Sequence, residues 1–536
     1  MRIKIPGIAF VLPLLLLSCG NSEKDAESNL INFITRHEST MIPLSEQINR
    51  TFWNYARTGA NVYMTRYDSL NQVKMEFLHD KRKFSYLKRL RESGRIKDAY
   101  LQRQLEILYR QYLPCQADLS LQVRIGRLQN HLKHEVWKKE KRMRARPIKD
   151  SDGYDARREA SLADSLLLLV DLRNELARQA GFSDYYALQF FLDEMDPAYV
   201  DELFARLEER TDSVFRQLRN EEYFPDYTGS FAPYGQRPQD ERRDACYGEV
   251  DMPHLALRFF SGIGLELEEV VAHSDFSRCY AKLPLFRCVT MDRKNDIRMV
   301  GILDGKETDM LKLLACCGEA AYWKSIPNTL PYLLRCPSSF MLQMGVASFF
   351  SRMVGYPDWS LSMGIFSAGQ AGRLRGTTSR EFVREQLFFC RWSLLVYHFE
   401  RRLYADRKTD LAGLWRELNR RYLFVDLDSD SEHAASRKRR EWMADTYFFV
   451  EACRIHDFLL AELWAAQVTE HLCTTYPKLG DPCSPFLVGS GEIGGYFRKS
   501  VFEPGAGLRW DDLTRLATGK DLGLESFVEQ FCQARK

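Results

Sequence analysis

The chain has 536 residues, a formal net charge of +3 and 45% hydrophobic residues. This length allows a large buried core, and so small a net charge argues against a nucleic-acid partner. Its 13 cysteines form no C-x-x-C pair, and a chain this long with so few cysteines is not a disulfide scaffold.

The first residues have the pattern of a lipoprotein signal. Arg2 and Lys4 precede ten residues from Ile8 to Leu17, too few to span a bilayer, which needs about 20. Leu16-Leu17-Ser18-Cys19 matches the pattern of a lipobox, the cleavage motif of lipoprotein signals. We therefore expect a signal peptide over 1–18, lipid attachment at Cys19 and a polar tether to residue 35. The mature protein is then anchored by lipid to a bacterial envelope membrane, periplasmic or surface-exposed. An ordinary secretory signal with an incidental cysteine is the alternative.

Helical periodicity dominates the rest of the chain. Apolar residues fall on one stripe between Asp98 and Leu113, and residues 161–180 and 197–219 behave similarly. Asp184 and Asp196 each precede an apolar-periodic run and are expected to begin helices. Strand-like alternation is confined to residues 286–303, around a turn at 293–296. The pattern predicts a mostly α fold with one small antiparallel sheet.

Two later segments determine the functional interpretation. They read Leu314-Ala315-Cys316-Cys317-Gly318-Glu319-Ala320-Ala321-Tyr322-Trp323-Lys324 and Leu333-Leu334-Arg335-Cys336-Pro337-Ser338-Ser339-Phe340-Met341-Leu342-Gln343-Met344-Gly345-Val346-Ala347. They resemble the zinc helix and the following helix of angiotensin-converting-enzyme-type peptidases, especially the bacterial members. There the patterns are L-H-E-L-G-H-A-x-Y-x-K and L-L-R-E-P-A-H-x-x-T-T-E-A-I-A. Residues 171–182, 459–467 and 493–519 extend the resemblance along the chain.

The resemblance implies that the zinc site is degenerate. Ala315 takes the place of the first histidine ligand, Cys316 that of the catalytic glutamate, and Glu319 that of the second histidine. Met344 takes the place of the third ligand, a glutamate. A catalytic zinc needs three protein ligands and a carboxylate that accepts the proton of the bound water. H-E-x-x-H, the spacing that supplies two of these ligands, occurs nowhere in the sequence. We therefore expect no cofactor, although the family uses zinc.

The resemblance also implies the architecture. It predicts one large helical ellipsoid over residues 36–536, like the gluzincin peptidases, with a deep central groove. Helices of residues 36–150 are expected to form part of that groove. Its candidate lining residues are Tyr322, Arg335, Ser339, Arg454 and His456. The run 453–458 carries no tyrosine, whereas the family has an oxyanion-stabilising tyrosine near this point.

These observations favour a non-catalytic relative that binds a peptide or a protein partner in its former active-site groove. One alternative is a working metallopeptidase with unconventional ligands, which needs a compensating His/Asp/Glu cluster that no sequence spacing reveals. Another is a structural component of an envelope complex. Cys316 and Glu319 share one helix face but lack a third ligand nearby, and His398 and His456 lie in apolar helices typical of core or groove residues. The G-x-G-x-x-G match at 489–494 lacks the strand and parallel sheet that nucleotide binding requires.

Overall fold

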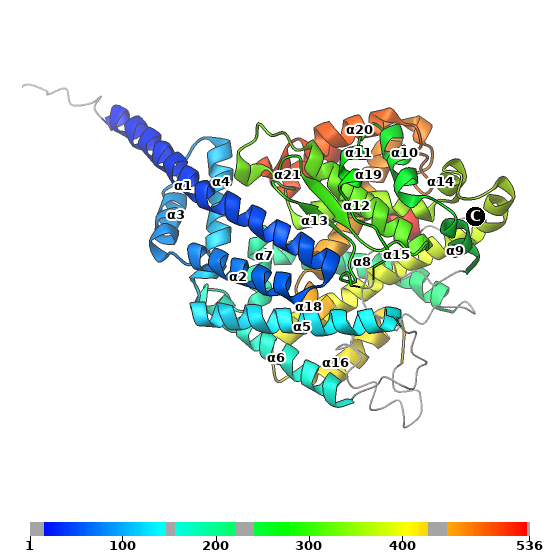
Figure 1. Ribbon diagram of the computed structural model, residues 1–536, viewed down its shortest axis with the longest axis horizontal. Helices are drawn as coiled ribbons and strands as arrows, with labels where there is room; N and C mark the ends of the chain where they lie inside the picture. The colour runs from blue at the N-terminus through cyan, green and yellow to red at the C-terminus, as the bar shows by residue number, and fades with distance from the viewer. Residues whose placement is uncertain (1–14, 146–155, 221–240, 280, 427–446, 533–536) are drawn as a thin grey trace, which may run out of the picture.

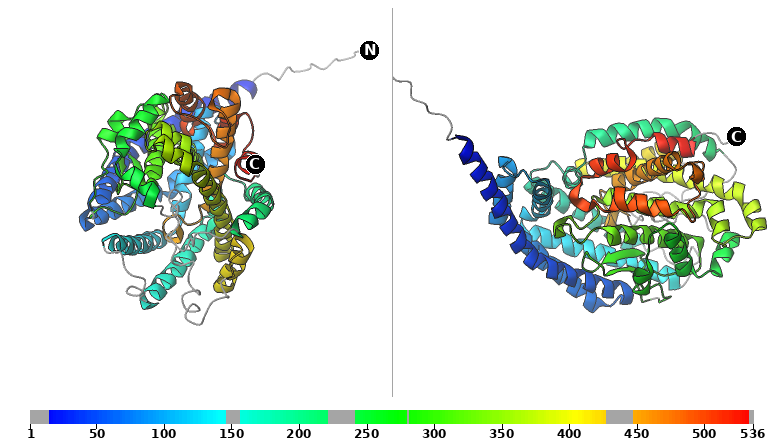
Figure 2. Two further views of the ribbon diagram at one scale, coloured as in Figure 1. Left: turned by 90° about the vertical axis from the view of Figure 1, so that its right-hand side faces the viewer. Right: turned by 90° about the horizontal axis from the view of Figure 1, so that it is seen from above.

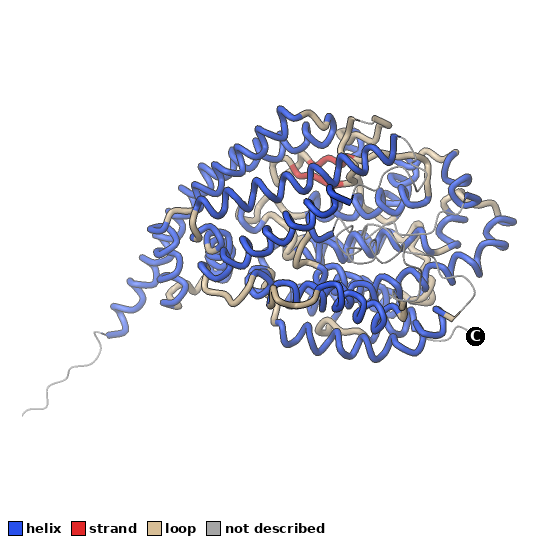
Figure 3. The backbone as a smooth tube through the Cα atoms, turned by 90° about the horizontal axis from the view of Figure 1, so that it is seen from below, coloured by secondary structure: helices blue, strands red, loops and turns tan. Residues whose placement is uncertain are grey.

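The computed structural model describes residues 15–145, 156–220, 241–279, 281–426 and 447–532. Helices account for most of this chain, and a single small sheet lies among them in these segments (Figure 3). The mostly α fold class is thereby confirmed. Most of the expected signal segment lies outside the described residues, as does the side chain of Cys19.

The N-terminal helices form one flank of an elongated body. They are α1 (Leu15–Thr58), α2 (Asn61–Leu78), α3 (Lys81–Ser93), α4 (Ala99–Tyr112) and α5 (Leu119–Ala145). The first turns of α1 project beyond the other helices (Figures 1 and 2). Residues 19–35, expected as a lipidated cysteine and tether, form part of α1, where Leu30 and Ile34 are buried. In the part of the chain that is described, no helix combines the length and apolarity needed to cross a bilayer.

Aspartates cap several helices at the positions that the sequence indicated. The next helices are α6 (Ala156–Gln179), α7 (Tyr185–Leu192), α8 (Pro197–Arg219), α9 (Glu241–Gly248), α10 (Met252–Gly262) and α11 (Glu268–Ala272). Asp184 accepts a hydrogen bond from Ala187 N at 2.8 Å, and Asp196 accepts one from Ala198 N at 2.9 Å. Such side chains satisfy backbone donors that the first helical turn leaves unpaired. Both expected helix starts are confirmed.

The sheet lies where strand-like alternation predicted it. Strands β1 (Arg287–Thr290) and β2 (Ile297–Val300) pair antiparallel, with Arg287 opposite Val300. Both strands pack on α12 (Glu307–Ser325), and Cys317 Sγ of that helix lies 4.0 Å from Met299 Sδ of β2. The sheet therefore covers one side of the helix that carries Ala315, Cys316 and Glu319.

Three helices form the centre of the molecule. Helix α13 (Phe340–Ser351) packs against α12 on one side and α19 (Ile455–Thr475) on another, and most residues of these helices are buried. The remaining helices are α14 (Pro357–Ser362), α15 (Ala368–Ala405), α16 (Leu411–Leu418), α18 (Tyr447–Val450), α20 (Gly491–Phe497), α21 (Trp510–Thr518) and α22 (Glu525–Cys532). Ala315, Cys316, Glu319 and Met344 thus lie on central helices and not on surface loops.

The glycine-rich segment and the cysteines have structural explanations. Gly494 N donates to Ile263 O at 2.8 Å, and a Cβ at Gly494 would overlap that carbonyl, so close helix contact accounts for this glycine. All twelve cysteines after Cys19 are free thiols, and Cys316 and Cys317 are among the buried ones. The absence of a bond between these neighbours agrees with the sequence prediction.

Candidate functional site

The positions that the resemblance aligns with two zinc ligands and the catalytic glutamate lie on α12 in the interior. Ala315 is 2% exposed, Cys316 is 4% exposed and Glu319 is 9% exposed. Burial raises the pKa of the Cys316 thiol well above its usual range. The thiol therefore stays protonated at neutral pH, and only a thiolate is an effective metal ligand or nucleophile. Cys316 cannot replace the carboxylate that accepts a proton in the peptidases.

Glu319 is the one side chain among the four degenerate positions that retains an oxygen donor. Gln343 of α13 donates a hydrogen bond from Nε2 to Glu319 Oε2 at 2.5 Å. Burial raises the pKa of Glu319 to about 7. The next residue, Met344, is 7% exposed and places a thioether where the family has its third ligand. The carboxyl group of Glu319 therefore links α12 to α13 through its hydrogen bond with the side-chain amide of Gln343.

The donors at these positions do not fit a catalytic zinc ion. Ala315 has no donor atom, and Met344 offers a neutral, soft sulfur, whereas zinc sites use histidine, carboxylate or thiolate ligands. Within the described residues, neither Cys316 nor Glu319 belongs to a group of three His, Cys, Asp or Glu side chains close enough to share an ion. One carboxyl group engaged by Gln343 cannot hold a catalytic metal.

Two glycines allow the central helices to pack closely. A Cβ at Gly318 would lie 2.6 Å from Phe350 Cδ2, and a Cβ at Gly345 would lie 2.6 Å from Trp464 Cε3. Both distances are shorter than any normal carbon contact. Gly318 thus allows α12 to approach α13, and Gly345 allows α13 to approach α19. Helix packing alone requires a small residue at both positions.

The candidate groove residues divide into interior and partly exposed positions. Tyr322 is fully buried, stacks on Phe502 with 4.9 Å between ring centroids, and accepts a hydrogen bond from Ser338 N at 3.3 Å. Ser339 is partly exposed and caps α13 by accepting from Leu342 N at 3.1 Å. Arg335, also partly exposed, donates from Nε to Leu330 O at 2.7 Å. Of these three, Arg335 and Ser339 offer surface to a ligand.

Arg454 and His456 meet two carboxylates that the sequence did not single out. The Arg454 guanidinium lies 3.4 Å from Asp193 Oδ1 and 3.3 Å from Asp457 Oδ2. His456 Nε2 lies 3.7 Å from Asp193 Oδ2 and 4.0 Å from Asp457 Oδ1. His456 is fully buried, and Asp457 is 1% exposed. Burial and the charge of Asp193 raise the pKa of Asp457. Burial also opposes ionisation of Asp193, but Arg454 and His456 together outweigh burial and hold the pKa of Asp193 below its usual range.

This cluster adjoins the start of α13. The Arg454 guanidinium lies 4.7 Å from the centre of the Phe340 ring, within cation–π range. Phe340 also meets Phe458 edge to face, with centroids 5.4 Å apart. Because Phe340 and Gln343 are three residues apart, they lie on neighbouring positions of one helix face. The first turns of α13 thus connect the degenerate zinc positions to the Asp193–Arg454–His456–Asp457 cluster.

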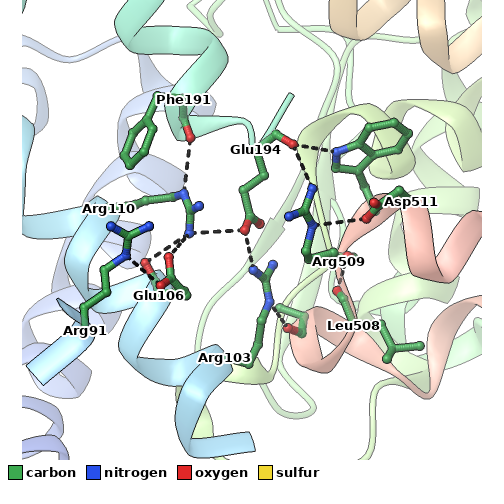
Figure 4. Close-up of polar contacts among 12 residues, drawn as sticks. Arg91, Arg103, Glu106, Arg110, Phe191, Glu194, Leu508, Arg509 and Asp511 are labelled. Carbon is green, nitrogen blue, oxygen red and sulfur yellow. Dashed lines mark hydrogen bonds and ion pairs between the residues drawn. The ribbon is translucent and has the colours of Figure 1, made fainter. Parts of the chain in front are cut away.

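A strained backbone position fixes Asp193. The next residue, Glu194, has a φ of 59°, in the left-handed region that side-chain-bearing residues rarely adopt. Its carboxylate contacts Arg103 at 2.7 Å and Arg110 at 3.1 Å, both from α4 (Figure 4). Its carbonyl accepts from Trp510 Nε1 at 3.1 Å and from Arg509 at 3.3 Å. Strain of this kind persists only where surrounding contacts over-determine it. These contacts hold the end of α7 against the N-terminal and C-terminal segments.

A tyrosine near α19 is committed to structure. Tyr447 of α18 donates to Glu400 Oε2 at 2.6 Å and accepts from Arg454 N at 2.9 Å and Ile455 N at 2.8 Å. Its hydroxyl therefore caps the start of α19 in the fully buried neighbourhood of Glu400. An oxyanion-stabilising donor must instead point at a substrate.

The comparisons with known proteins establish the fold. A solved structure described as "BsuCP Crystal Structure" matches with a TM-score of 0.68 and 15% sequence identity. The match covers 95% of this chain and 98% of that chain. The two proteins share a fold. No family model matches the chain, and no curated protein matches it.

Sequence reasoning singled out Arg454 and His456 but missed Asp193, Asp457 and Glu194. Asp457 directly follows His456, so the pair was visible in the sequence as adjacent ionisable residues inside an apolar helix. Asp193 and Glu194 come from a distant turn after α7, and no local pattern marks them. Only the tertiary structure brings these residues together.

Proposed function

We propose that the protein is an envelope lipoprotein that has kept an angiotensin-converting-enzyme-type peptidase scaffold without its zinc chemistry. It binds a peptide or a protein partner in the groove that the resemblance implies. One observation carries the proposal: Gln343 engages Glu319, the single oxygen donor left at the zinc positions. The tight helix contacts at Gly318 and Gly345 support it, because they preserve the scaffold independently of catalysis.

We expect the purified protein to bind unstructured peptides and release them intact. Fluorescence anisotropy measures binding, and mass spectrometry of the recovered peptide, with and without added Zn²⁺, detects cleavage. Arg335 is partly exposed and offers a cation to a carboxylate or carbonyl of the ligand. Hydrogen bonds to charged groups contribute about 1.5–3 kcal/mol, so Arg335→Ala should weaken binding by about tenfold or more.

The matched control is Arg178→Ala, because Arg178 lies on α6 with a side chain 54% exposed and forms a surface ion pair with Glu175. Its peptide affinity should equal that of the parent. Peptide cleavage that a chelator abolishes would instead favour a metallopeptidase with unconventional ligands. A complete lack of peptide binding would favour a structural component of an envelope complex.

The membrane anchor is a separate part of the proposal. The lipobox that ends at Cys19 supports it. A single acyl chain binds membranes only marginally, whereas a lipoprotein carries several chains and anchors stably. We expect Cys19→Ala to move the protein from the membrane fraction to the soluble fraction of the producing bacterium. An unchanged distribution of the Cys19→Ala variant would contradict lipid attachment.

A further inference from the structure

Three buried polar atoms without a hydrogen-bond partner face one another beside α19. They are Asp193 Oδ2, His456 Nε2 and Asp457 Oδ1. These atoms lie within 4.8 Å of one another, and among the described residues they form the only such group of three His, Cys, Asp or Glu side chains. Buried polar groups are nearly always paired, because an unpaired group loses its hydration without compensation. Three such atoms close together leave hydrogen-bonding and metal-binding capacity that a bound species would use.

The charge of the cluster favours a cation at that point. Each carboxylate gives one oxygen to Arg454, at 3.4 Å for Asp193 and 3.3 Å for Asp457, and turns its other oxygen toward His456. Arg454 neutralises one of the two carboxylate charges. When both carboxylates are ionised and the imidazole is neutral, the cluster keeps a net negative charge that a cation can balance. Arg454 also orients both carboxylates, as outer partners of metal ligands do.

The imidazole of His456 is held in a suitable orientation. Its Nδ1 lies 3.4 Å from the hydroxyl of Tyr186, and its ring stacks on Phe190 with centroids 4.6 Å apart. A neutral imidazole that donates its Nδ1–H to Tyr186 keeps a lone pair on Nε2. Metal-binding histidines commonly use their second nitrogen in this way. His456 Nε2 lies 3.7 Å from Asp193 Oδ2 and 4.0 Å from Asp457 Oδ1.

We propose that Asp193, His456 and Asp457 form a binding site for one divalent transition-metal ion. An imidazole with two carboxylates suits zinc and related ions, whereas magnesium and calcium prefer oxygen ligands alone. Two ligand atoms of a tetrahedral zinc lie about 3.4 Å apart, given bond lengths of about 2.1 Å. The distances of 3.7 Å and 4.0 Å from His456 Nε2 to the carboxylate oxygens exceed this value by about 0.3 Å and 0.6 Å, and the three atoms lie within 4.8 Å of one another, so the side chains must move together to bind the ion.

The site is closed and therefore structural. A catalytic zinc keeps a coordination position open to water or substrate, whereas His456 is fully buried and Asp457 is 1% exposed. An ion here would join the end of α7, through Asp193, to the first turn of α19. This metal site goes beyond the proposed peptide binding and is independent of the degenerate positions on α12.

Metal content of the full-length protein tests the proposal. After removal of metals with a chelator, the protein is titrated with Zn²⁺, and in a parallel arm with Mg²⁺, and bound metal is measured by elemental analysis after gel filtration. We expect one equivalent of Zn²⁺, no retained Mg²⁺ and a higher thermal midpoint in the zinc-loaded form, since a ligand that binds only the native state stabilises it. Failure to retain Zn²⁺ would overturn the proposal in favour of a proton or a water molecule at this point.

Conservative variants locate the ion. Asp193→Asn and Asp457→Asn keep side-chain volume and a hydrogen-bond acceptor for Arg454, and each should weaken Zn²⁺ binding at least tenfold and abolish the zinc-dependent rise in thermal midpoint. Glu319→Gln should leave both unchanged. If the asparagine variants do not fold, the absorption spectrum of Co²⁺ bound to the parent protein locates the ion. A spectrum typical of nitrogen and oxygen ligands supports the site, whereas a spectrum typical of sulfur ligation by Cys316 or Met344 contradicts it.

The two proposals fail in different ways. Zinc lost in Glu319→Gln but retained in Asp193→Asn would overturn the site, and would also contradict the loss of the α12 zinc centre. Zinc absent from every form would overturn the metal site alone, because peptide binding without cleavage would be unaffected.

Discussion

Replacing Arg352 by methionine is expected to lower the free energy of unfolding by about 3–5 kcal/mol. Arg352 follows α13, is 2% exposed, and lies 2.5 Å from Glu462 Oε2 in α19. It also donates to the Glu462 carbonyl at 2.8 Å, while Ser348 bonds the other carboxylate oxygen. Methionine fills a similar space but leaves the Glu462 charge buried without its partner. Equilibrium urea denaturation followed by circular dichroism measures the change.

Two further variants separate charge from packing. Adding Glu462→Gln to Arg352→Met removes the unpaired charge and should restore most of the lost stability, because replacing both members of a buried pair costs little. Arg178→Met removes a surface pair, with side chains 54% and 47% exposed, and should change stability by less than about 1 kcal/mol. An Arg352→Met loss no larger than that of Arg178→Met would show that the pair does not hold α13 against α19.

Local chemistry explains which elements the sequence could predict. Asp184 and Asp196 mark helix starts because an aspartate before an apolar-periodic run pairs the free backbone donors within the same turn. Alternation over 286–303 marked the sheet, since strand side chains alternate between two faces. Each signal acts within a few residues and needs no knowledge of the rest of the chain.

The arrangement of side chains on the central helices could not be predicted in the same way. A helix with one apolar stripe shows which face is buried, but α12 is buried on nearly all sides between the sheet and α13. The sequence therefore could not distinguish Tyr322, fully buried against Phe502, from a groove residue. His456 is another such residue, since its partner Asp193 comes from the end of another helix. Long-range contacts of this kind produce no periodic pattern in the sequence.

Replacing Glu319 by glutamine is expected to stabilise the protein at alkaline pH and to have little effect at acidic pH. Burial raises the pKa of Glu319 to about 7 from a usual value of 4.5, and the hydrogen bond from Gln343 offsets this only in part. Between pH 4.5 and about pH 7, Glu319 keeps its proton in the folded protein but releases it in the unfolded chain. The free energy of unfolding therefore falls as pH rises from about 4.5 to about 7 and then levels off.

Glutamine cannot ionise but keeps a carbonyl that accepts the Gln343 bond. The stability difference between Glu319→Gln and the parent should therefore grow from near zero at pH 4 to the order of 3 kcal/mol at pH 8, at 1.36 kcal/mol per pKa unit. Thermal midpoints across this range measure it, and all other titrating groups cancel in the comparison. Glu202→Gln, at an exposed position of α8, should show a small difference at both ends. A Glu319→Gln variant less stable than the parent at pH 8 would contradict the raised pKa of Glu319 and would indicate that a bound cation holds its carboxylate ionised.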